Sequence, residues 1–199
     1  MKIIKATFLI FAVLLPSMLW AKASPIPMLE STANQIINTL EKNRGQLKKN
    51  QQIIFQAVEK HLLPIVDMRG MARSVLGRNA WKKATAAQKR AFTREFTQLV
   101  IRTYASPLAE YSDERVKFLP LRGNANGRFV RVNSVIMRSN GQNIPLNYSL
   151  VSKNGEWKIY DLSVEGVSLL QSFRTQFSQV LQNADMDTLI KQMRKEKVA

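Results

Sequence analysis

The chain of 199 residues is 45% hydrophobic, contains no cysteine, and carries 30 basic against 14 acidic residues, a net charge of +16. This length suits one domain with a substantial core, and the hydrophobic content excludes wholesale disorder. The absence of cysteine excludes disulfides, thiolate catalysis and cysteine-ligated zinc. The positive charge points to nucleic acid, an anionic membrane or an acidic protein as the partner.

The first 23 residues have the layout of a secretory signal peptide. Lys2 and Lys5 precede the apolar run TFLIFAVLLPSMLW, and an A-x-A site ends at Ala23. Because the run is shorter than a bilayer-spanning helix, we expect cleavage after Ala23 rather than a retained anchor. Loss of Lys2, Lys5 and Lys22 lowers the net charge of the mature chain, 24–199, to +13. We expect a soluble protein in the periplasm, which makes nucleic acid the poorest of the three partners.

Helices are predicted over 28–111. Apolar residues recur at helical spacing in three short segments: 33–40, 54–62 and 68–76. Pro64 stops the second of these helices, Asp67 is a good N-cap for the third, and Gly77 stops it. A longer helix begins at the capping box formed by Thr85 and Gln88, and it carries a broad apolar stripe from Phe92 onward.

Strands are predicted over 116–164, where the apolar period changes from the helical spacing to two. Four segments show this alternation, and short turns at 139–141 and Asn154–Gly155 join the last three: 116–120, 129–138, 144–153 and 157–164. Helical spacing then returns over 168–197. The sequence therefore predicts an α+β fold, in which a curved antiparallel sheet of about four strands has helices over one face.

Few residues are suited to catalysis. His61, the single histidine, lies at the end of a predicted helix, and no nucleophile or phosphate-binding motif is present. Asp161 and Glu165 are four residues apart, so both side chains would lie on the same face of the sheet if both residues belong to one strand. Two carboxylates in one cavity could then act as a general acid and a general base. The favoured interpretation is structural: Asp161 binds backbone donors or an arginine, and Glu165, beside Gly166, shapes a turn or caps the next helix.

The stretch from Asp67 to Tyr111 resembles the toluene-tolerance auxiliary family of ABC transport systems, the MlaC family. The residues that carry the resemblance there are Asp67, Met71, Leu76–Gly77, Trp81, Ala84–Thr85, Gln88, Phe92, Phe96, Leu99, Tyr104, Leu108 and Tyr111. A second and more specific block comprises Tyr160–Asp161, Glu165–Gly166–Val167–Ser168, Phe173–Arg174 and Phe177. The resemblance extends over nearly the whole mature chain.

This resemblance implies a nuclear-transport-factor-type cone plus a helical subdomain. It also implies that the protein holds phospholipid acyl chains inside, with the head group toward solvent. It implies no enzyme activity and no cofactor besides the bound lipid. The implied role is a periplasmic carrier, expected to be a monomer, that maintains outer-membrane lipid asymmetry. The implied partners are an inner-membrane ABC transporter with its lipid-binding ring component and an outer-membrane lipoprotein–porin complex.

Apolar residues on the predicted helices and strands are the expected wall of the lipid site. They are Met68, Met71, Val75, Phe92, Phe96, Val100, Tyr104, Leu146, Tyr148, Ile159, Leu162, Val164, Val167, Leu170 and Phe173. Two alternatives remain open at this stage. One is an isomerase or dehydratase that uses Asp161 or Glu165 as a base on a small apolar substrate, and the other is a basic adaptor with no internal ligand.

Overall fold

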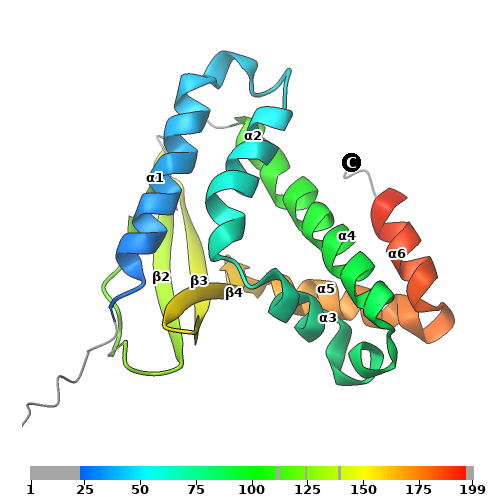
Figure 1. The fold of residues 1–199 in the computed structure, drawn as a ribbon. Coiled ribbons are helices and arrows are strands. Elements are labelled where there is room, and N and C mark those ends of the chain that lie inside the picture. The colour runs from blue at the N-terminus through cyan, green and yellow to red at the C-terminus, as the bar shows by residue number, and fades with distance from the viewer. Residues whose placement is uncertain (1–22, 111–112, 124, 139, 196–199) are drawn as a thin grey trace, which may run out of the picture.

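The computed structural model describes residues 23–110, 113–123, 125–138 and 140–195, with the backbone alone at 105–107 (Figure 1). The predicted signal peptide, 1–22 of which is undescribed, therefore lies outside it except for Ala23. The α-helices are α1 Ile26–Lys42, α2 Gln52–Ala57, α3 Met68–Lys83, α4 Ala86–Ala105, α5 Leu169–Asn183 and α6 Met186–Lys195. The strands are β1 Arg115–Phe118, β2 Phe129–Met137, β3 Asn143–Lys153, β4 Glu156–Val164 and β5 Val167–Ser168. Short 3-10 or π segments span Arg44–Gln46, Val58–Leu62, Leu63–Ile65 and Ser106–Glu110.

The strands form one antiparallel sheet in the order β1-β2-β3-β4-β5, which confirms the predicted α+β fold and its four main strands. The two-residue strand β5 was not predicted. Positive φ angles at Asn154 (52°) and Gly155 (85°) make the β3–β4 connection a tight type I′ turn, as the Asn-Gly pair indicates. Glu165 (51°) and Gly166 (85°) repeat this geometry between β4 and β5.

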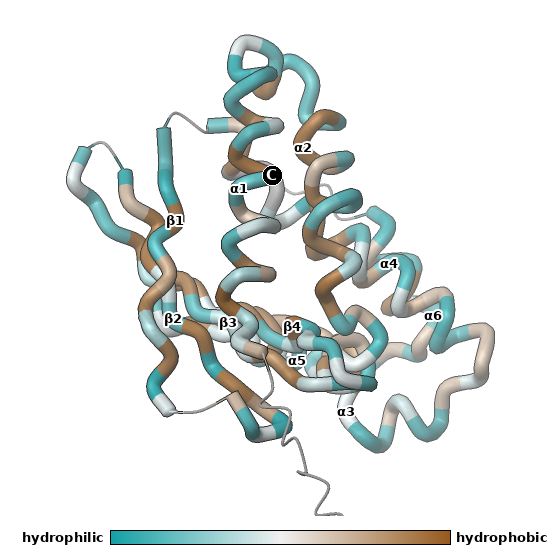
Figure 2. The backbone as a smooth tube through the Cα atoms, turned by 60° about the vertical axis from the view of Figure 1, so that its left-hand side comes forward, coloured by the Kyte–Doolittle hydropathy of each residue, from teal (hydrophilic) through white to brown (hydrophobic). Residues whose placement is uncertain are grey.

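One face of the sheet, called the inner face below, is covered by α1 and by the segment before α3 (Figures 1 and 2). Val132, Leu150 and Ile159 are fully buried there, and Leu29 of α1 packs against them. A β-bulge displaces the β3–β4 register between Ser149 and Leu150, so that Ile159 and Leu162, three apart, both lie on the inner face. The sheet and α1 therefore share one core.

A second core joins α3, α4, α5 and α6 (Figure 1). Its centre is a cluster of rings: Phe92 stacks on Phe96 with centroids 5.9 Å apart, and Phe173 meets Phe96 edge-on at 5.2 Å. Phe177 completes the cluster against Phe92. Each such ring contributes about 1.5–3 kcal/mol through burial alone, so this cluster fixes the helical part of the fold.

Two predicted caps are confirmed. Asp67 accepts a hydrogen bond from the Gly70 N–H (3.1 Å), and Thr85 and Gln88 exchange the reciprocal bonds of a capping box (3.0 and 3.1 Å). The stop predicted at Gly77 is confirmed locally. Gly77 has φ 73° and ψ 166°, a conformation that only glycine adopts readily, so the helical backbone is interrupted there, and a second helical stretch, not predicted, continues from the kink to Lys83.

No helix in the described part of the chain has the length and apolar character needed to cross a bilayer. The indole N–H of Trp157 donates to the carbonyl of Ala23 at 2.8 Å, which ties the start of the described chain to the sheet.

Candidate functional site

An apolar row crosses the inner face at the β4–β5 end of the sheet. Leu146 pairs with Val164, and Val164 pairs in turn with Val167, so the three side chains stand side by side on one face. Val167 is 63% exposed, and Leu146 and Val164 are only partly buried. An exposed row of this kind is unusual for the helix-covered face of a sheet and is the first component of the candidate site.

Two helical residues with partly exposed side chains lie near Asp161 of β4. Tyr104, near the end of α4, is 41% exposed and contacts Phe173 of α5 with ring centroids 6.4 Å apart. Partial burial, together with the nearby Asp161 carboxylate, raises the pKa of Tyr104 above its ordinary value. Leu170, one turn before Phe173 on α5, is partly buried. Leu146, Val164, Val167, Tyr104 and Leu170 are together called the apolar strip below.

The structure places twelve of the fifteen predicted wall residues in the helical core or the sheet core, and Tyr104, Val164 and Val167 in neither. Five are fully buried within the helical core, where neighbouring side chains already fill the space: Met71, Val75, Phe92, Phe96 and Phe173. Met68, Val100 and Leu170 pack against that core from outside. Leu146, Tyr148 and Ile159 belong to the sheet core, and Leu162 touches both cores. Only the partly exposed members offer apolar surface directly to a ligand.

Ile136 and Ile144 were missed as candidates. They are paired residues of β2 and β3 and lie on the inner face, two positions along from Leu146. Both are only partly buried. The alternation of Ile144 with Leu146 was a usable signal, because residues two apart on a strand share a face.

Asp161 has a structural role in this arrangement. One carboxylate oxygen accepts from the Ser168 hydroxyl (2.6 Å) and the other from the Leu170 N–H (3.1 Å). Ser168 in turn accepts from the Gln171 N–H (3.1 Å) and is the N-cap of α5. The expectation that Glu165 caps this helix is wrong, because Glu165 is exposed in the β4–β5 turn. Asp161 therefore joins β4 to the start of α5, and the two acids do not form a pair in a common cavity.

Other potentially reactive groups do not gather at the strip. His61 is partly buried at the end of a π-helical turn. Burial raises the pKa of Tyr148 well above its ordinary value, so this residue stays neutral. Within the described ranges no group of three histidine, aspartate or glutamate side chains is placed to bind a metal.

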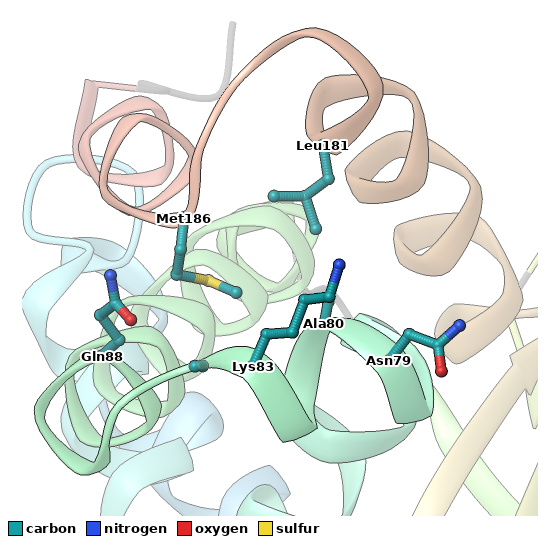
Figure 3. Close-up of a pocket in the computed structure, with 7 residues that line it drawn as sticks. Asn79, Ala80, Lys83, Gln88, Leu181 and Met186 are labelled. Carbon is teal, nitrogen blue, oxygen red and sulfur yellow. The ribbon is translucent and has the colours of Figure 1, made fainter.

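Two surface pockets lie away from the strip. One, of about 290 Å³, is lined by Lys83, Gln88 and Asn79 together with Leu181 and Met186, where α3 and α4 meet the α5–α6 corner (Figure 3). The other, of about 510 Å³, lies between α3 and α4 and is lined mainly by basic side chains. Neither contains a predicted wall residue. The fold and site thus define an α+β protein with a partly exposed apolar strip on its sheet and helices, and the described residues include no polar catalytic cluster at this strip.

Comparison with known proteins assigns the chain to a family. The family described as MlaC protein matches residues 30–195. The toluene tolerance protein ttg2D of Pseudomonas putida is 26% identical over 185 residues, covering 93% of this chain and 86% of its own length. The intermembrane phospholipid transport system binding protein MlaC of Haemophilus influenzae is 27% identical over 190 residues, covering 94% and 88% respectively. This chain belongs to the MlaC family.

A solved structure shares the fold. It is a phospholipid-binding protein from Ralstonia solanacearum in complex with a phospholipid, which superposes with a TM-score of 0.78 at 26% identity. The match covers 87% of this chain and 96% of that one. The α+β arrangement is thus shared by a relative that holds a phospholipid.

Proposed function

We propose that this protein binds phospholipid, with the acyl chains against the apolar strip, and carries it between membranes through the periplasm. The observation that carries the proposal is Val167, an apolar residue left 63% exposed beside the partly buried Val164 and Leu146 on the inner face. Membership of the MlaC family, and the phospholipid in the relative from Ralstonia solanacearum, support this assignment of the ligand.

A carrier of this kind must shield the acyl chains of its lipid from water. Two acyl chains contain about 30 methylene groups, and at about 0.8 kcal/mol each their exposure to water would cost over 20 kcal/mol. The protein must therefore cover the chains, yet it must not bind them much more strongly than a bilayer does. A site lined by apolar side chains meets both demands, because the free energy of transferring the acyl chains from the bilayer to the protein is then close to zero.

Loading proceeds, in this proposal, from the strip inward. Tyr104, Val164 and Val167 make the first contacts because their apolar surface is already accessible. Leu162 touches both cores, so the chains extend along it as the cores separate. The buried ring cluster of Phe92, Phe96 and Phe173 contacts lipid only when its own packing opens.

We infer no enzymatic role, since both oxygens of Asp161 are engaged by Ser168 and Leu170 and Glu165 is exposed at a turn. The proposed partners are an inner-membrane ABC transporter with a lipid-binding ring component and an outer-membrane lipoprotein–porin complex. The proposed overall role is maintenance of outer-membrane lipid asymmetry by a monomeric carrier.

Val167→Glu tests the proposal against Met137→Glu as a matched control. Met137 is also exposed (39%), but it lies on the opposite face of the sheet, since Ile136 beside it faces inward. Both variants are expected to fold, because exposed substitutions usually change stability by about 0.5 kcal/mol or less. A carboxylate covered by acyl chains costs several kcal/mol, so Val167→Glu should reduce lipid uptake from vesicles about 100-fold or more.

Lipid bound to the re-isolated protein is measured by extraction and mass spectrometry. Uptake that is normal in Met137→Glu and lost in Val167→Glu supports the strip as the site. Normal uptake by a folded Val167→Glu protein would show that the chains lie elsewhere.

A further inference from the structure

The sequence between Asp67 and Glu95 is strongly one-sided in charge. It contains eight basic residues and no acidic one: Arg69, Arg73, Arg78, Lys82, Lys83, Lys89, Arg90 and Arg94. These residues lie on α3 and on the first half of α4, which are neighbours in the fold (Figures 1 and 2). The fold brings four of these cations together at one pocket between the two helices: Arg69, Lys89, Arg90 and Arg94.

The kink at Gly77 concentrates this charge further. Arg69 and Trp81 are twelve residues apart, which is about 18 Å along a straight helix. Because α3 bends at Gly77, both side chains line the same pocket of about 510 Å³. From α4 the same pocket is lined by Ala86, Lys89, Arg90, Thr93 and Arg94.

The cations of this pocket are largely uncompensated. Within the part of the chain that the structure describes, Arg69, Lys89 and Arg90 form no ion pair. Arg94 pairs with Glu95 at 3.0 Å. The Lys89 ammonium lies 5.8 Å from the ring centre of Trp81, a cation–π contact that holds the indole beside the charges.

We propose that this basic pocket and the α3–α4 face around it dock on a bilayer surface that contains anionic phospholipid. Clusters of four to eight Lys or Arg on a helical surface suit an anionic head-group layer, and tryptophan favours the same depth. Trp81 is the one large apolar side chain among the residues that line the pocket, and four cations surround it, which is the composition expected of a surface that faces anionic head groups.

This docking surface is separate from the apolar strip, since none of its residues belongs to the strip. It goes beyond the proposed lipid cargo by naming how the protein approaches a membrane. A carrier that rests on the head groups through α3 and α4 is held at the bilayer while the strip loads or unloads.

The test is co-sedimentation of the protein with vesicles of phosphatidylcholine alone, or of phosphatidylcholine partly replaced by phosphatidylglycerol. The wild-type protein is expected to bind only the anionic vesicles, and more weakly as salt is raised. The triple substitution Arg69→Gln/Lys89→Gln/Arg90→Gln should weaken binding about 100-fold, since each charge contributes about a five-fold factor near an anionic surface.

A matched control removes the same charge elsewhere. Lys42 at the end of α1, Lys49 before α2 and Lys60 in the segment Val58–Leu62 are exposed, and none of them lines the basic pocket. Their triple replacement by Gln should lower binding only slightly. Equal losses in the two triple variants would overturn the proposal, because binding would then depend on net charge alone.

Two further outcomes complete the test. In the first, the wild-type protein does not bind the anionic vesicles but is retained on immobilised polyglutamate, and the triple variant of Arg69, Lys89 and Arg90 is not retained. The face would then fit an acidic protein, and the membrane proposal would be wrong. Val167→Glu, expected to take up no lipid, should still dock as the wild type does. Docking of Val167→Glu at the wild-type level supports this inference whether or not its lipid uptake is lost, so the two proposals can fail separately.

Discussion

Replacement of Asp161 is the substitution that best separates a structural from a catalytic role for this carboxylate. Asp161→Ala removes two charge-assisted acceptors at the start of α5, those for the Ser168 hydroxyl (2.6 Å) and the Leu170 N–H (3.1 Å). Such bonds contribute about 1.5–3 kcal/mol each, and Ser168 still caps Gln171, so we expect a loss of about 2–4 kcal/mol. Asp161→Asn retains one acceptor oxygen and should cost about half as much.

The assay is urea unfolding at neutral pH, followed by circular dichroism. Glu165→Gln is the control, because its side chain is exposed in the neighbouring turn and should change stability by about 0.5 kcal/mol or less. Asp161→Asn should also lower the pKa of Tyr104 toward its ordinary value, since the Asp161 charge helps to raise it. Unchanged stability in Asp161→Ala would refute the structural role and return this carboxylate to consideration as a base.

Three further changes test the fold. Gly77→Ala should lower the free energy of unfolding by about 1–3 kcal/mol, because alanine is strained at φ 73° and ψ 166°. Gly45→Ala is the control and should leave stability unchanged, because a Cβ at Gly45 meets open space; the urea midpoints of the two variants are compared. Thr85→Ala removes half of the capping box and should cost about 1 kcal/mol by the same measurement. Burial raises the pKa of Tyr148 above its value of 10 in the unfolded chain, so the contribution of this residue to stability is complete below pH 10 and is lost as the pH rises further. Tyr148→Phe removes the ionisable hydroxyl and should therefore reduce the loss of stability at alkaline pH, measured by unfolding at a series of pH values.

Much of the fold followed from local chemistry in the sequence. The Asn154–Gly155 pair supplies two residues that tolerate positive φ, so it determines both the turn and the register of β3 with β4. The Thr85–Gln88 box fixed the start of α4 in the same way, because its bonds lie within four residues.

Features that depend on distant partners were not predictable from the sequence. The bulge after Ile159 exists because β4 pairs with β3, and β5 forms only because the turn at Glu165 and Gly166 returns the chain to β4. Gly77 predicts the interruption of the helix, whereas the helical stretch that follows it to Lys83 was not predicted.

The candidate site was predictable as a list of apolar residues but not as a surface. Periodicity places Phe96 and Val167 equally on apolar faces. Only tertiary packing makes the first fully buried and leaves the second 63% exposed. The basic pocket was missed for the same reason, because the contacts that bring Arg69 and Trp81 together arise only from the bend in α3.

The central claim is that this protein holds phospholipid, and native mass spectrometry of the protein purified without detergent tests it most directly. The account predicts a folded species with stoichiometric phospholipid, whose mass increment and extracted lipid identify the chains held. A homogeneous lipid-free protein that also takes up no lipid from vesicles would contradict it.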